Sequence, residues 1–219
     1  MNESVVALAA LVAALLADER ERVEATTRKG VVQPRPRTPE ELARVADEAT
    51  AGFLAWIECQ GLTGYDGLRH AVAVPEAMAD LEAAVGARFL GHGVSRAVFD
   101  LGDAVLKLQW NPGEWGHSDN QYEAETWEWA LQHPEARLHE VLMPVLAVAP
   151  DGWWLVMAQA SPTWGASWCR SEEQSLRKTL ARVEERHGMR VDDASTHNLG
   201  WHEGRLKVLD YAVFYRPIL

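Results

Sequence analysis

The stretch V-D-D-A-S-T-H-N-L-G-W-H-E-G-R-L-K-V-L-D-Y-A, residues 191–212, carries the most informative polar pattern in the chain. Asp193 and Asn198 stand five residues apart in a polar loop, and a predicted strand at residues 206–209 leads directly to Asp210. Such a unit can bring two carboxylates and one amide oxygen around a single point, and Mg²⁺ prefers oxygen ligands of this kind. Because an ordinary hairpin would show the same residues, the meaning of this pattern depends on what precedes it.

A second informative stretch contains two glycines and a lysine. Residues 89–99 alternate around Gly91 and Gly93, and a tight turn separates them from an apolar run at residues 104–108. This pattern predicts a β-hairpin with a glycine bend in its first arm. Glycines allow the backbone to approach a ligand closely, and free N–H groups there can hold phosphate oxygens. Lys107 lies in the apolar run, where its ammonium either reaches water, as in an ordinary hairpin, or meets a partner.

The next segment supplies two candidate partners for this lysine. Residues 121–131 favour a helix by propensity. This predicted helix carries Glu123 and Glu125. Only one of the two can face Lys107, and an acid exposed on the helix surface is the simpler alternative for either. A buried Lys–Glu pair would fix the lysine for a phosphate. Two strands and a long helix are predicted to follow, at residues 141–148, 153–157 and 171–187.

The first third of the chain is predicted to be helical. Helices are expected at residues 4–28, 38–59 and 75–85, separated by a proline-rich linker and by a loop at 61–67. Thr38 is the N-cap of the second helix, with Pro39 at the first helical position and Glu41 at the capping-box position. We interpret this region as a helical cap or dimerisation element without recognisable chemistry.

Composition restricts the partners and the location. A net charge of -11 argues against nonspecific binding of nucleic acid or an anionic membrane, because both require a basic surface. The apolar run at residues 5–16 is too short to cross a bilayer and lacks preceding basic residues, so a buried helix fits better than a targeting segment. Cys59 and Cys169 have no metal-ligand spacing. We therefore expect a cytoplasmic protein with no nucleic-acid and no membrane partner.

The order of these features resembles the protein-kinase-like fold over residues 88–212. It runs from a glycine turn through a strand with lysine, a helix with glutamate, two strands and a long helix to a D-x-x-x-x-N loop and a strand followed by aspartate. The resemblance implies an α+β fold: a kinase-like, antiparallel β N-lobe with one helix, a shortened C-lobe and a helical N-terminal extension. The expected boundaries are 1–80 for the extension, 81–160 for the N-lobe and 161–219 for the C-lobe.

The resemblance also implies a role for single residues in nucleotide binding. Three residues, Gly91, Gly93 and Val98, belong to a stretch that looks like the glycine-rich loop over the nucleotide phosphates. Lys107 resembles the strand lysine that holds the α- and β-phosphates, with Glu123 or Glu125 as its ion-pair partner. Met157 begins the segment that would contact adenine through backbone groups.

The loop residues of the opening stretch receive catalytic and metal-binding roles in the same way. Asp193 matches the catalytic aspartate that accepts or orients the proton of the attacking hydroxyl, acting together with Lys107. Asn198 and Asp210 match the metal-binding asparagine and aspartate. These matches imply ATP and Mg²⁺ as cofactors.

The chain also departs from the kinase pattern. Arg96 stands where the loop has its third glycine, and Ser195 stands where protein kinases carry a phosphate-contacting lysine. Ala212 replaces the last glycine of D-F-G. Only nine residues follow Asp210, so neither an activation segment nor a large helical lobe for a peptide substrate is expected.

Two functions fit this combination. The first is an ATP/Mg²⁺-dependent kinase-like phosphotransferase that acts on an unknown acceptor, a protein or a small molecule, and the retention of Lys107, Asp193, Asn198 and Asp210 favours it. The second is a pseudokinase, a nucleotide-sensing or protein-binding module without catalysis, which the missing lobe and Ser195 favour. An unrelated α+β structural protein is a third alternative.

Overall fold

The computed structural model describes residues 35–110, 118–162, 170–191, 194–211 and 213–215. The chain divides into two compact units, Met1–Pro36 and Arg37–Leu219. The elements described below all belong to the second unit. The helix predicted at residues 4–28 lies outside the described residues.

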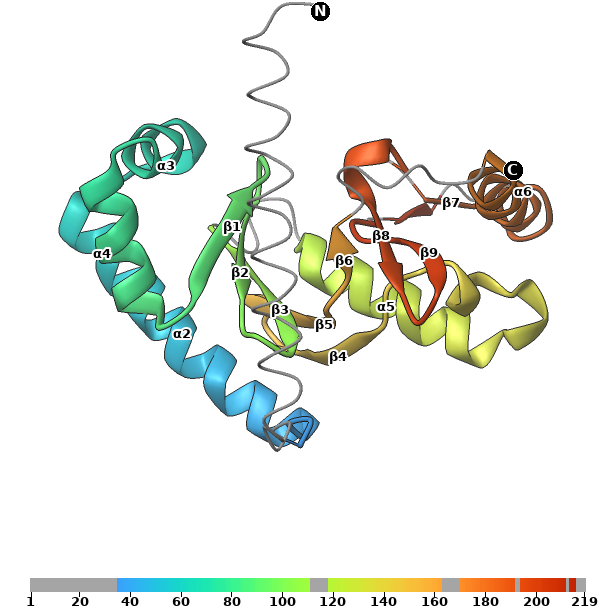
Figure 1. Ribbon diagram of the computed structural model, residues 1–219, viewed down its shortest axis with the longest axis horizontal. Helices are drawn as coiled ribbons and strands as arrows, with labels where there is room; N and C mark the ends of the chain where they lie inside the picture. Colours follow the sequence, from blue (N-terminus) through green and yellow to red (C-terminus); the bar gives the residue numbers. More distant parts are fainter. Residues whose placement is uncertain (1–34, 111–117, 163–169, 192–193, 212, 216–219) are drawn as a thin grey trace, which may run out of the picture. The chain divides into compact units, whose positions relative to one another are not determined.

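Five antiparallel strands form the central sheet, in the order β1-β2-β3-β5-β4 (Figure 1). The strands are β1 Arg88–His92, β2 Arg96–Asp100, β3 Ala104–Gln109, β4 Val145–Val148 and β5 Trp154–Ala158. The predicted hairpin is present, but its first arm is two strands rather than one bent strand. The N–H of Gly93 donates to the carbonyl oxygen of Arg96 at 2.8 Å, which closes the turn between β1 and β2.

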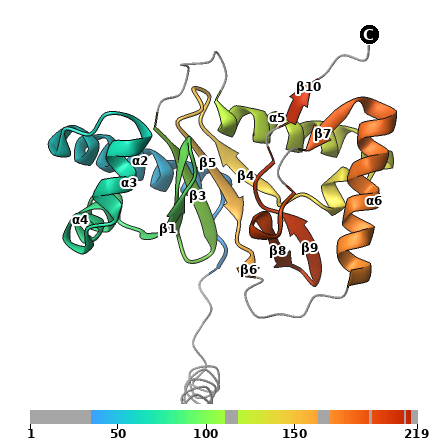
Figure 2. The ribbon, with the colours of Figure 1, turned by 90° about the horizontal axis from the view of Figure 1, so that it is seen from above.

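Three helices, α2 (Pro39–Gln60), α3 (Gly64–Val72) and α4 (Pro75–Val85), lie on one side of this sheet (Figures 1 and 2). The capping box predicted at Thr38 is confirmed: its N–H donates to the Glu41 carboxylate at 2.8 Å, and its hydroxyl accepts the Glu41 N–H at 3.3 Å. The loop predicted at residues 61–67 is wrong, because α3 already begins at Gly64. Burial of Leu68, which is 1% exposed, favours the helix there despite the poor helix propensity of glycine.

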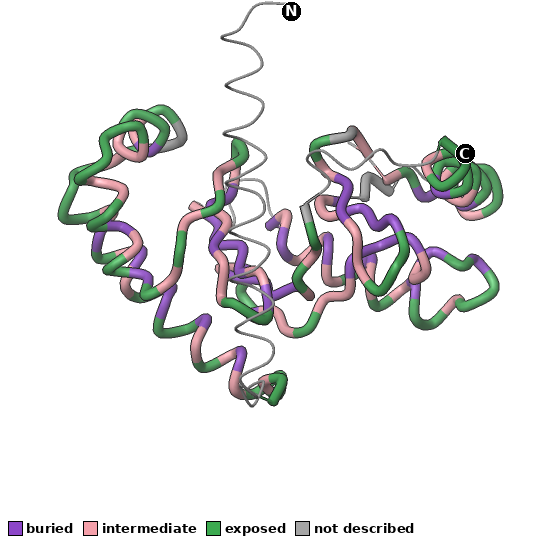
Figure 3. The backbone as a smooth tube through the Cα atoms, in the orientation of Figure 1, coloured by how far each residue is buried: buried purple, intermediate pink, exposed green. Residues whose placement is uncertain are grey.

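Two hydrophobic cores lie on opposite faces of the sheet, and β5 contributes to both. Trp154 and Val156 belong to the core shared with α2, α3 and α4, whereas Leu155 and Met157 belong to the second core. This division follows from strand geometry, in which successive side chains point to opposite faces. Figure 3 shows the buried positions that result along the middle strands. The sheet therefore ties the N-terminal helices to the C-terminal part of the chain.

The C-terminal part is built from two helices and several short elements. These are α5 (Asp119–Gln132), α6 (Arg170–His187), β6 (Ser161–Pro162), β7 (Met189–Val191), β8 (Leu199–His202), β9 (Arg205–Val208), β10 (Val213–Tyr215) and the 3-10 helices η1 (Pro134–Ala136), η2 (Leu138–Glu140) and η3 (Thr196–Asn198). The helices predicted at 121–131 and 171–187 are confirmed. The strand predicted at 141–148 is correct only in its second half, because Leu142 pairs with Val208 instead of with the sheet. Strand β8, which pairs with β9, was not predicted.

The predicted α+β class is confirmed. Helix α5 follows β3 in the chain and is the helix that precedes β4 and β5, and the arrangement is consistent with a kinase-like fold with a shortened C-lobe. The expected domain boundaries at residues 80 and 160 stay a prediction. Over the described part of the chain, no helix is both long enough and apolar enough to cross a membrane.

Candidate functional site

A cavity of about 490 Å³ lies between the sheet and the β8–β9 hairpin. Seven residues predicted for the site line it: Gly91, Gly93, Val98, Lys107, Met157, Asn198 and Asp210. They come from β1 and the turn after it, from β2, β3, β5 and η3, and from the segment that follows β9, so the fold gathers residues that are far apart in the sequence. Asp193, the predicted catalytic aspartate, lies outside the described residues.

The two glycines border open space. A Cβ atom added at Gly91 or Gly93 would meet nothing within 4 Å, so close packing against the protein does not require glycine at either position. The pairing of β1 with β2 shifts register between Phe89 and Gly91, which marks an irregularity in the strand at this point. A role for these glycines in ligand approach stays a prediction.

Lys107 forms a buried ion pair with Glu123. Its ammonium donates to both carboxylate oxygens of Glu123, at 2.9 and 3.0 Å, and to the carbonyl oxygen of Leu209 at 2.7 Å. Glu123 is fully buried, and Lys107 is 6% exposed. Burial lowers the pKa of the Lys107 ammonium below its ordinary value, whereas the charge of Glu123 acts in the opposite direction. The sequence left open whether Glu123 or Glu125 faces Lys107, and in the structure Glu123 does.

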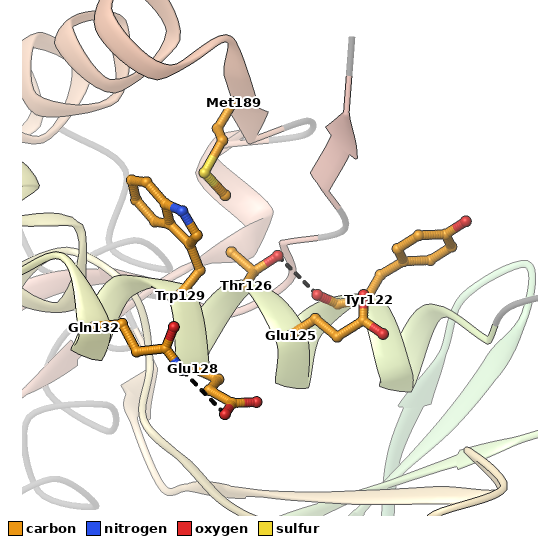
Figure 4. A pocket seen from close by; sticks show the side chains of 7 residues that line it. All are labelled: Tyr122, Glu125, Thr126, Glu128, Trp129, Gln132 and Met189. Carbon is orange, nitrogen blue, oxygen red and sulfur yellow. Dashed lines mark hydrogen bonds between the residues drawn. The ribbon is translucent and has the colours of Figure 1, made fainter. Parts of the chain in front are cut away.

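Glu125 lies on another face of α5 (Figure 4). It is exposed and lines a separate cavity of about 330 Å³ together with Trp129 and Met189. Residues two apart on a helix differ by about 200° around its axis, which is why the two glutamates diverge. The structure does not bring Glu125 to Lys107.

Arg96 joins the same cluster, although the sequence singled it out only as a departure from the glycine pattern. Its guanidinium lies 2.9 Å from the Glu123 carboxylate through Nη1 and bonds the Asp210 carboxylate through Nη2. Arg96 is 5% exposed. Burial by itself would lower the pKa of this guanidinium, but the charges of Glu123 and Asp210 raise it instead. The one signal of this contact in the sequence was an arginine at the position where the kinase pattern has its third glycine.

Asp210 connects the buried cluster to the cavity. Its side chain is 44% exposed, and one of its oxygens accepts from Arg96. Burial would raise the pKa of this carboxyl, but the charges of Lys107 and Arg96 hold the pKa well below its usual range. The carboxylate is therefore ionised at neutral pH.

Backbone hydrogen bonds position the loop and the residues around Asp210. The N–H of Leu209 donates to the carbonyl oxygen of Asn198 at 2.8 Å, which fixes η3 beside the end of β9. Tyr211, which is fully buried, donates its N–H to Glu123 at 2.8 Å and its hydroxyl to the carbonyl oxygen of Met143 at 2.6 Å. Asn198 and Asp210 are thus presented to one cavity by a hydrogen-bonded frame.

The oxygen ligands in the cavity suit a hard cation. Asn198 offers an amide oxygen, and Asp210 offers a carboxylate that is ionised and partly exposed. No cluster of three or more histidine, cysteine, aspartate or glutamate side chains with metal-binding geometry occurs among the described residues. Asn198 and Asp210 are the residues that would hold a Mg²⁺ ion here, and phosphate or water would supply its other oxygen ligands.

Comparison with known proteins adds no family. No family model matches the chain, and no curated protein matches it significantly. A crystal structure of WbdD is similar at 22% identity and a TM-score of 0.41, over 59% of this chain and 33% of that chain. WbdD crystallised with the kinase inhibitor LY294002 is similar at 22% identity and a TM-score of 0.39, over 58% of this chain and 33% of that chain. The chain spans about a third of the length of these neighbours, and a likeness this weak adds nothing to the geometry above.

Proposed function

We propose that this protein binds a nucleoside triphosphate such as ATP in the cavity and, with Mg²⁺, transfers its terminal phosphoryl group to an acceptor. One observation carries the proposal. Lys107, which forms a buried ion pair with Glu123, lines the same cavity as Asn198 and Asp210. Phosphoryl transfer depends mainly on positioning and on charge stabilisation, and this arrangement provides both.

The inner part of the cavity suits a nucleobase. Apolar side chains from both sides line it: Val98, Val105, Met143, Met157 and Leu199. Flat, apolar surroundings with a few polar backbone groups are typical of sites that bind a base. The base would lie between the sheet and β8, with the phosphates directed toward Lys107.

The other end of the cavity suits the phosphates. Lys107 offers an ammonium whose position Glu123 fixes, and Asn198 and Asp210 are the residues that would hold Mg²⁺. When bound, the ion would screen the charge of the phosphate oxygens. Asp193 is proposed to orient the attacking hydroxyl, a role that rests on the sequence pattern alone.

A second function, a nucleotide-sensing or protein-binding module without catalysis, has one observation in its favour. Arg96 already bonds the carboxylate of Asp210 that would hold the metal. A measurement of γ-phosphate release or transfer from ATP separates the two functions. Turnover favours the enzyme, whereas tight binding without turnover favours the module.

The site itself is tested by replacing Lys107. Lys107→Met is expected to weaken ATP binding roughly ten- to a hundredfold, because about 1.5–3 kcal/mol of charged hydrogen bonding to phosphate is lost. Adenosine, which has no phosphates, should bind this variant almost as tightly as it binds the unaltered protein. Calorimetric titration with both ligands gives the two affinities.

The matched control is Lys207→Met. Lys207 is another buried lysine, 7% exposed, and it donates to the carbonyl oxygen of His139 at 3.1 Å, apart from the cavity. This variant should retain both affinities. Equal weakening of ATP and adenosine by Lys107→Met would show that Lys107 is a packing residue and would refute the phosphate site.

A further inference from the structure

Arg96 gives the cavity a permanent cation beside the carboxylate that would hold a metal. Four charges meet at this point in the described structure: those of Arg96, Lys107, Glu123 and Asp210. The two cations balance the two anions. A further anion, Asp119, also acts on Arg96 and accepts a hydrogen bond from Ser95. The charge of Asp210 is compensated by its direct ion pair with Arg96 before any ligand arrives.

The position of Arg96 keeps it paired with Asp210 in the folded protein. Asp210 lines the cavity, whereas Arg96 is not among the described residues that line it. The guanidinium therefore contacts the carboxylate from behind the cavity wall. A guanidinium keeps its proton at all relevant pH values. Moving Arg96 away would leave the fully buried Glu123 with one cation fewer, and breaking a buried ion pair is strongly unfavourable. The contact between Arg96 and Asp210 is thus a fixed part of the folded structure.

The electrostatic consequence concerns the phosphates. An aspartate without such a partner repels the phosphates of a nucleotide, and a divalent cation is then required to bring the two together. An aspartate already paired with arginine repels them much less, because the guanidinium offsets its charge at short range. Adding a divalent cation to a carboxylate that Arg96 already pairs with gains correspondingly little.

We propose that Arg96, by pairing with Asp210, allows the cavity to bind a nucleoside triphosphate without a divalent cation. This inference rests on the proposed nucleotide site and deepens it. Arg96 acts through Asp210 and is a positioning residue. A divalent cation then serves the transfer step rather than affinity.

The test is a comparison of ATP affinities with and without Mg²⁺. ATP is titrated calorimetrically into the full 219-residue chain, once with EDTA and once with saturating Mg²⁺. The two dissociation constants of the unaltered protein are expected to agree within about threefold. In Arg96→Gln, the affinity in EDTA should fall by roughly tenfold or more, and Mg²⁺ should restore most of it, because Asp210 is then uncompensated.

Two further variants separate charge from structure. Arg96→Lys keeps a cation at this position and should restore most of the binding in EDTA. Arg37→Gln removes an arginine that is also paired with an aspartate, Asp103, but stands outside the cavity lining, so it should behave like the unaltered protein. The ratio of the two dissociation constants is the readout, and a merely structural role of Arg96 would not change it.

Three outcomes would overturn the inference, each in a distinct way. Affinity of the unaltered protein that strengthens tenfold or more with Mg²⁺ would refute it without any variant, so the test does not depend on the folding of Arg96→Gln. A ratio that stays near one in Arg96→Gln would remove Arg96 from the explanation. Absence of ATP binding in both conditions would refute the proposed nucleotide site itself and the inference with it.

Discussion

The carboxylate of Glu123 accepts a hydrogen bond of 2.8 Å from the backbone N–H of Tyr211, a residue 88 positions further along the chain. The same carboxylate pairs with Lys107 on β3 and Arg96 on β2. One side chain of α5 therefore connects two strands of the sheet to the segment that carries Asp210. The geometry of the candidate site depends on this fully buried carboxylate of Glu123.

Replacement of Glu123 should destabilise the whole fold. Glu123→Gln leaves Lys107 and Arg96 buried with less negative charge, and loss of a buried partner of this kind costs about 3–5 kcal/mol of unfolding free energy. Urea denaturation followed by circular dichroism measures the change. Glu125→Gln, on the exposed face of the same helix, should change stability by less than about 0.5 kcal/mol. Similar losses in both variants would contradict a special role for Glu123.

The hydroxyl of Tyr211 should contribute to stability through one contact. Tyr211→Phe removes the donor to the carbonyl oxygen of Met143, a hydrogen bond of 2.6 Å between buried groups. The expected loss of unfolding free energy is about 1–3 kcal/mol, because the carbonyl oxygen stays buried without this donor. Thermal and urea unfolding give the value. A Phe variant as stable as the unaltered protein would mean that this hydrogen bond contributes nothing.

The packing of α2 against α4 should depend on Gly52. A Cβ atom there would lie 1.9 Å from the carbonyl oxygen of Ala84, so Gly52→Ala forces the two helices apart. We expect a loss of about 1–3 kcal/mol, typical of overpacking. Gly67→Ala in α3 is the control, since its Cβ would meet Leu62 at 3.6 Å, an ordinary contact. The control should be neutral or more stable by up to about 1 kcal/mol, because alanine favours helices.

Stability should fall in acid partly through Asp210. Its pKa in the folded protein lies below the ordinary value of 3.8. A carboxyl with a lowered folded pKa stabilises the protein above its unfolded pKa, and this contribution is lost as the pH falls below about 4. Asp210→Asn should therefore be less stable than the unaltered protein at neutral pH, and the difference should shrink as the pH falls.

Urea unfolding at several pH values between about 6 and 2 tests this dependence. The control is Asp80→Asn, on the exposed surface of α4, which should run parallel to the unaltered protein. A difference between Asp210→Asn and the unaltered protein that stays constant with pH would show that Asp210 does not contribute through its charge.

Local signals in the sequence determined much of the secondary structure. The capping box at Thr38 and the proline that follows it placed the start of α2, and the α4 range was predicted to the residue. These features depend on contacts within one helical turn, which neighbouring residues decide by themselves. Where tertiary packing opposed a local signal, as at the glycine that begins α3, the prediction failed.

The lysine strand followed from its apolar run in the sequence. The other residues around the cavity followed from the order of motifs that resembles the kinase-like fold. The sequence could not decide which glutamate meets Lys107. That choice depends on the rotation of α5 against the sheet, which the second hydrophobic core sets through residues such as Leu155 and Met157.

The contact between Arg96 and Asp210 was decided by tertiary structure alone. The two residues stand 114 positions apart, and neither belongs to a local pattern that names the other as its partner. By itself the sequence determined that a cation and a carboxylate would be present. Their pairing arises because the sheet carries Arg96 to the place where β9 ends, and burial there leaves a charge no better partner than an opposite charge.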